Sequence, residues 1–111
     1  MIERKNAQHY VWGDICEGWN LLKTDELSII EERIPPGGSE TRHHHQRARQ
    51  FFYILSGVLS FEIDGKEYEL TSRQGIEIGP SVPHCVFNRA DKDVEFLVIS
   101  CPPTHTDRVQ D

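Results

Sequence analysis

Short β-prone runs, separated by glycine and proline turns, are the feature that most constrains how this chain can fold. Residues 58–63 alternate at period two, which places Leu59 and Phe61 on one face of a strand. The Asp64-Gly65 pair that follows is a strong hairpin signal, so the next run returns as an antiparallel strand. No stretch shows a helical period, and the pattern therefore predicts an all-β sandwich or barrel. Further strands are expected over residues 27–34, 50–56, 76–78, 84–88 and 94–99.

The chain has 111 residues, which is the size of one domain. We expect residues 27–101 to form the barrel, preceded by an N-terminal arm over residues 1–26 and followed by a C-terminal tail over residues 102–111 that reads as a loop. Trp12 and Trp19 make the arm rich in aromatic side chains. Such an arm either closes the end of the core or forms a contact with a second copy of the chain.

Composition excludes several functional classes. The net charge of −6 argues against a nucleic-acid surface, which needs clustered basic residues, and no apolar run approaches membrane length. The first residues are polar and do not resemble a signal peptide. The cysteines, Cys16, Cys85 and Cys101, are odd in number and contain no Cys-x-x-Cys pair, which suits reduced thiols. A cytoplasmic protein that contacts neither nucleic acid nor membrane is expected.

Three consecutive histidines interrupt the strand pattern. Because successive side chains of a strand alternate faces, His43 and His45 point one way and His44 points the other. Two imidazoles at i and i+2 can bind one metal ion, and the chain offers Gln50 and His84 as further ligands. The alternative, a surface histidine run or a tag, is less consistent with an internal run. His84 alone has the simpler alternative of a satisfied loop histidine.

The residues around the histidines resemble the first conserved motif of the cupin superfamily. That motif has a glycine, five residues, His-x-His, four residues, an acid, six residues and a glycine. The second cupin motif, a proline-rich loop followed by His, three residues and Asn, resembles the stretch from Pro80 to Asn88. Both motifs occur in order, and the resemblance extends over residues 27–99. The first motif is matched without a gap by Gly37, His43, His45, Gln50 and Gly57.

The resemblance implies a single-domain double-stranded β-helix, or jelly-roll, barrel with a metal at its mouth. Its ligands would be His43, His45, the residue at position 50, and His84. The sequence departs from the motifs in three places. Gln50 replaces the usual acid, Arg73-Gln74 replaces a Gly-Asp pair, and the loop around Pro80 has changed neighbours. Only the first departure affects the chemistry of the site.

An amide oxygen at position 50 leaves the metal with its full +2 charge, since no carboxylate neutralises it. Bound water is then more acidic and a substrate oxygen more strongly polarised. We expect one divalent transition metal (Zn, Mn, Fe or Ni) that acts as a Lewis acid in an isomerase or lyase reaction. Alternatively, Gln50 does not coordinate and only hydrogen-bonds to a ligand of the metal.

Phe52 and Ile54 share the inward face with Gln50, and Val86 and Asn88 follow His84 inward. The alternation therefore predicts that these four residues line a mostly apolar pocket for a small organic acid or ketone. Two weak catalytic candidates stand nearby: Arg42 as a carboxylate anchor and Glu32 as a base. Solvated surface charge is the simpler interpretation of both.

The expected function is that of a metal-dependent enzyme acting on a small polar or carboxylated metabolite. The alternatives are a metal-dependent dioxygenase and a non-catalytic cupin that binds or senses a small ligand. The ligand set is also similar to that of cupins that ketonise unsaturated uronic acids, but residues 99–103 lack the acid of that family. Small cupins are commonly homodimers, and residues 94–99 are apolar on both faces, so a homodimer is expected.

Overall fold

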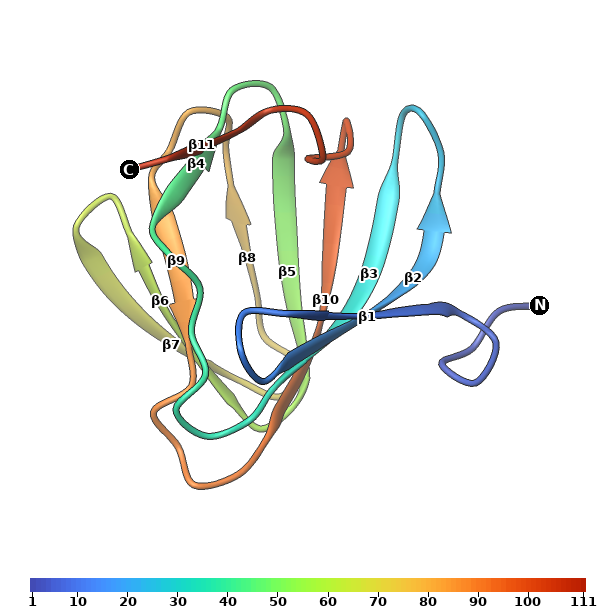
Figure 1. Ribbon diagram of the computed structural model, residues 1–111. Helices are drawn as coiled ribbons and strands as arrows, with labels where there is room; N and C mark the ends of the chain where they lie inside the picture. Colours follow the sequence, from blue (N-terminus) through green and yellow to red (C-terminus); the bar gives the residue numbers. More distant parts are fainter.

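The structure is a computed structural model that describes residues 1–111, and it consists of strands in two antiparallel sheets (Figure 1). The six-stranded sheet contains, in spatial order, β1 (Gln8–Trp12), β2 (Cys16–Lys23), β3 (Ser28–Ile34), β10 (Val94–Cys101), β5 (Arg49–Ser56) and β8 (Gly75–Ile78). The five-stranded sheet contains β11 (Arg108–Gln110), β4 (His43–His45), β9 (His84–Phe87), β6 (Val58–Ile63) and β7 (Lys66–Thr71). The expected all-β fold is confirmed.

Turn chemistry explains where the central strands begin and end. Asp64 and Gly65 both have positive φ, 50° and 85°, as the tight β6–β7 hairpin requires. Gly57 separates β5 from β6 with φ of 86°, and a Cβ atom there would lie 2.5 Å from the carbonyl oxygen of Asp93. Only glycine combines that backbone conformation with so close an approach. The Asp64-Gly65 turn makes β6 and β7 antiparallel neighbours, and the turn at Gly57 takes the chain from β5 in one sheet to β6 in the other.

The apolar core lies between the two sheets. Leu59 and Phe61 from β6 are fully buried, as their alternation predicts, and they meet Phe96 and Ile54 of the opposite sheet in one cluster. The ring of Phe52 packs edge-on against Phe61, with 5.2 Å between ring centroids. Burial of this apolar surface is the main source of folding free energy and holds both sheets in place around the polar end of the barrel.

The two ends of the chain are more ordered than the sequence indicates. β1 and β2 form a hairpin that extends the six-stranded sheet beyond β3. The C-terminal segment leaves β10, crosses to the other sheet and pairs as β11 with β4, so part of the expected loop is a strand (Figure 1). Along β10, buried residues alternate with half-buried ones, so the outward face of this strand is only partly covered. No helix of the structure is long and apolar enough to cross a membrane.

Candidate metal centre

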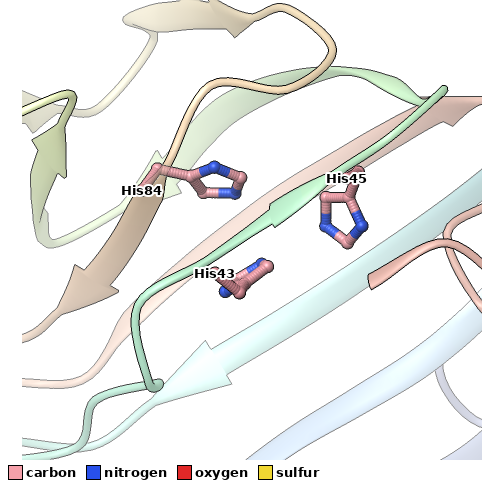
Figure 2. A group of neighbouring side chains, drawn as sticks. All are labelled: His43, His45 and His84. Carbon is pink, nitrogen blue, oxygen red and sulfur yellow. The ribbon is translucent and has the colours of Figure 1, made fainter. Parts of the chain in front are cut away.

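The structure brings the three predicted histidines together. His43 and His45 lie on β4, His84 lies on β9, and His43 pairs with His84 in the sheet register. Each ring offers one nitrogen within 4.8 Å of those of the other two, and the rings point toward one another (Figure 2). Between ring centroids, the distances are 4.5 Å for His43 and His84 and 4.9 Å for His43 and His45. All three side chains are buried.

Backbone carbonyls set the orientation of two of the rings. The Nδ1 atom of His43 lies 2.9 Å from the carbonyl oxygen of Thr41, and that of His84 lies 2.9 Å from the carbonyl oxygen of Val82. Because a carbonyl only accepts, Nδ1 carries the hydrogen and Nε2 keeps its lone pair. Burial lowers the pKa of His43 to about 4 and also lowers the pKa of His84. Both rings are therefore neutral near pH 7, as metal binding requires.

His45 is oriented by a carboxylate that the sequence analysis missed. Its Nδ1 atom donates to Oδ1 of Asp107 at 3.1 Å, and the other carboxylate oxygen accepts the backbone N–H groups of Arg47 and Ala48. Burial raises the pKa of Asp107, but these backbone hydrogen bonds outweigh it and the pKa lies below its usual range. A carboxylate behind a ligand histidine fixes its tautomer and makes the free nitrogen more basic. No local pattern marks Asp107, which reaches His45 only because β11 pairs with β4.

Gln50 lines the same cavity as the three histidines but comes from the opposite sheet. Its side chain is buried on β5, and Nε2 donates to Oγ of Ser100 at 3.2 Å. Its Oε1 atom has no hydrogen-bond partner, and the same is true of the buried Nε2 atom of His84. Buried acceptors without partners are costly and rare. Two such acceptors in one polar cluster of imidazoles fit a cation that accepts both lone pairs.

A cavity of about 300 Å³ adjoins the histidines. Phe52 lines it, as predicted, but the other three expected pocket residues do not. Ile54 and Val86 belong to the buried core cluster. Asn88 is buried too, and its amide donates to the carbonyl oxygens of Ile34 and Lys92. The prediction was wrong for these residues because a shared inward face does not place a side chain at the same depth in the barrel.

The two charged candidates have different positions. Arg42 lies on the outer surface, where its Nε atom donates to Glu62 at 2.7 Å, so it does not anchor a ligand in the cavity. Glu32 does line the cavity, together with a second carboxyl, Glu40, and the cationic Arg108. Burial, reinforced by Glu40, raises the pKa of Glu32 to about 8, and burial raises the pKa of Glu40 to about 7.

The ends of the chain supply much of the cavity wall. The β1–β2 hairpin and the C-terminal segment contribute five lining residues that sequence reasoning did not assign to a site, and the segment before β4 contributes a sixth, Glu40. The six residues are Tyr10, Trp12, Glu40, Thr104, His105 and Arg108. Except for the aromatic residues of the arm, no signal in the sequence marks them, because they lie far from one another along the chain.

Residues 30–100 match the Cupin_2 family, described as a cupin domain. Among curated proteins, an uncharacterized protein of Methanocaldococcus jannaschii is 29% identical over 89 residues, 79% of this chain and 71% of that protein. The oxalate-binding protein of Thermotoga maritima is 28% identical over 67 residues. That match covers 60% of this chain and spans only 55% of the relative.

Solved structures share the fold at low sequence identity. The polyketide cyclase RemF of Streptomyces resistomycificus has a TM-score of 0.86, with 18% identity over 99% of this chain and 83% of its own. A predicted oxalate decarboxylase of Thermotoga maritima has a TM-score of 0.84, with 19% identity over 93% of this chain and 99% of its own. These likenesses establish the double-stranded β-helix architecture. With residues 30–100 matched and both sheets in that arrangement, the chain belongs to the Cupin_2 family of cupin-domain proteins.

Proposed function

We propose that this cupin binds one divalent transition metal, Zn, Mn, Fe or Ni, through His43, His45, His84 and Gln50. The observation that carries the proposal is the pair of buried acceptors without partners, Nε2 of His84 and Oε1 of Gln50. The convergence of the three imidazoles supports it independently. A ligand set of three neutral nitrogens and one neutral oxygen leaves the +2 charge of the ion uncompensated.

The proposed activity is an isomerase or lyase reaction on a small polar or carboxylated metabolite. The metal supplies Lewis acidity that polarises an oxygen of the bound compound. Glu32, in the wall of the same cavity, exchanges a proton with the bound compound. A carboxyl whose pKa lies near 8 suits this task at neutral pH, because it can both hold and release a proton there. Arg108 supplies the positive charge that attracts a carboxylate.

Metal analysis tests the first part of the proposal. Protein purified without nickel resin should contain close to one equivalent of a transition metal by mass spectrometry of the dissolved ions. Added Mn, Fe, Ni or Zn should raise the melting temperature of metal-stripped protein, because a ligand that binds only the folded state stabilises it. Protein that carries no metal and does not respond to any of these ions would contradict the proposal.

A non-catalytic binding role is the second candidate. Its support is the relative named as an oxalate-binding protein, whose match includes 60% of this chain. Binding and turnover of keto acids, uronates, phenols and oxalate separate the two roles. The same assays in the presence of oxygen test the dioxygenase alternative. An enzyme converts at least one compound that it binds, whereas a binding protein returns it unchanged.

We further propose a homodimer in the cytoplasm. Phe51 and Leu55 are 41% and 39% exposed on the outward face of the six-stranded sheet, where a second copy could cover them. All three cysteines are free, which suits a reducing compartment. Light scattering should give twice the 12.8 kDa chain mass, and a mass equal to that of one chain would contradict the dimer.

A further inference from the structure

A tyrosine from the N-terminal hairpin reaches the cavity beside Glu32. Tyr10 on β1 is paired with Gly18 on β2, and Gly18 is paired with Glu32 on β3. The three residues therefore form one row across the six-stranded sheet, with glycine in the middle. Tyr10 and Glu32 both line the cavity that the histidines of the other sheet adjoin. The row thus faces the candidate metal ligands from the opposite sheet.

Gly18 makes the position of the tyrosine possible. A Cβ atom on Gly18 would lie 2.4 Å from Cζ of Tyr10 and 2.5 Å from its hydroxyl oxygen, distances that no real side chain tolerates. The phenol end of the ring therefore lies directly over the α-carbon of Gly18 and is directed along the row toward Glu32. Any larger residue at position 18 must displace the ring.

The chemistry of the phenol suits recognition of an oxygen atom. Burial, reinforced by the neighbouring charge of Glu32, raises the pKa of Tyr10 well above its usual value, so the hydroxyl stays protonated. A protonated phenol donates a hydrogen bond to a carboxylate or carbonyl oxygen. Arg108 lines the same cavity and adds positive charge, which favours an anionic ligand. Tyr10 also lines a second cavity of about 300 Å³, so its ring forms part of the wall between the two.

We propose that Tyr10, held in place by Gly18, donates a hydrogen bond to an oxygen of the bound ligand and so selects small carboxylates that extend from the histidines to the opposite sheet. The inference rests on the proposed function, since the other end of the ligand lies at the metal. Tyr10 is a specificity-determining residue, and Gly18 is a positioning residue that acts through it.

An unfolding experiment tests the geometry without metal or ligand. Gly18→Ala should lower the melting temperature by roughly 5 °C, because the new methyl group overlaps the ring. In a Tyr10→Ala background the same substitution should cost little or raise stability, since alanine suits a strand better than glycine once the ring is gone. Equal costs in the two backgrounds would overturn the role assigned to Gly18.

A binding experiment tests the function, with oxalate as the probe and cobalt-loaded protein as the receptor. Tyr10→Phe keeps the ring in the cavity wall and removes only the hydroxyl. Calorimetry should show about tenfold weaker oxalate binding, the loss expected for one hydrogen bond to a charged group, with cobalt affinity unchanged. Tyr68→Phe, the same change on the exposed ring of β7, is the matched control and should not weaken oxalate binding.

The outcomes separate this inference from the proposed function. Loaded wild-type protein that ignores oxalate, or a Tyr10→Phe variant within twofold of wild type, would overturn the inference and leave the metal site intact. Wild-type protein that takes up neither cobalt nor any of Zn, Mn, Fe and Ni would overturn both proposals. A selective loss in Tyr10→Phe, reproduced in Gly18→Ala, would support the assignment of both residues.

Discussion

The cavity has two kinds of wall that differ in where their residues stand in the chain. The candidate metal ligands come from the central strands β4, β5 and β9, and three of the four lie within eight residues, from His43 to Gln50. The remaining wall draws on more distant parts of the chain, and five of its residues come from opposite ends, from β1 and from the segment Thr104 to Arg108.

The two walls also differ in charge. The central strands present neutral imidazoles and an amide, whereas the rest of the wall carries the carboxyls of Glu32 and Glu40 and the cation of Arg108. If the cavity binds a metal as proposed, we expect the central strands to determine its affinity and the other wall to determine what else is bound. Asp107 is the exception, because a terminal residue there supports a central ligand.

Loss of a central ligand should have the largest effect. We expect His84→Ala to weaken metal binding at least about a hundredfold, since it removes one of three nitrogen donors. Isothermal titration with zinc into metal-stripped protein measures the change. His44→Ala is the matched control, because His44 lies on the same strand as His43 but contacts Asp111 on the outer side. Similar zinc affinity in both variants would contradict the assignment of the ligands.

Asp107→Asn should have the next largest effect. A loss of metal affinity in this variant would show that a residue outside the central strands also contributes to metal binding. The substitution keeps an oxygen near Nδ1 of His45 but removes the negative charge, and support of this kind is typically worth roughly ten- to a hundredfold in metal affinity. The same zinc titration measures it. Asp111→Asn, beside His44, is the control and should bind zinc as wild type does. An unchanged affinity in Asp107→Asn would restrict metal binding to the central strands.

Gln50→Leu distinguishes direct coordination from hydrogen bonding. If Oε1 binds the ion, we expect roughly tenfold weaker zinc binding, whereas Ser100→Ala, which removes only the partner of Nε2, should change it little. Equal effects of the two substitutions would mean that Gln50 only hydrogen-bonds in the site. Circular dichroism is the control that checks whether both variants remain folded.

Glu32→Gln should have the smallest effect on the site. We expect it to alter how the free energy of unfolding of the metal-free protein depends on pH. The folded chain keeps the Glu32 proton to about pH 8, whereas the ordinary carboxyl pKa of 4.5 applies on unfolding. Stability from this group is therefore complete below pH 4.5 and is lost as pH rises to about 8. Glu40 raises this pKa, Arg108 lowers it, and Tyr10 is the third titratable neighbour.

Glutamine does not ionise, so in urea unfolding the variant should become progressively more stable than wild type as pH rises from 5 to 8.5. Glu69→Gln on the exposed face of β7 is the control for the loss of one surface charge. A difference that stays constant across this range would show that Glu32 titrates as an ordinary surface carboxyl.

The alternation of strand residues correctly predicted which face of a strand each side chain occupies. It did not predict how far along the barrel the side chain lies from the cavity. Gln50, Phe52 and Ile54 do share an inward face, and all three are buried. Each residue advances the strand by about 3.3 Å, so Ile54 lies roughly 13 Å beyond Gln50 and falls in the core instead of the cavity. Arg42 departs from its prediction for the complementary reason, since the residue before His43 points to the outer surface.

The sequence by itself determined the strands between residues 27 and 101, the tight turns and the grouping of His43, His45 and His84, because period-two alternation, turn residues and motif spacing are local properties. Only the tertiary structure decided that Asp107 supports His45 and that Tyr10 and Arg108 enter the cavity wall. Those positions depend on the pairing of β11 with β4 and of β1 with β2. The physical reason is that sheet register between distant segments follows from packing of the whole barrel, which no short stretch of sequence encodes.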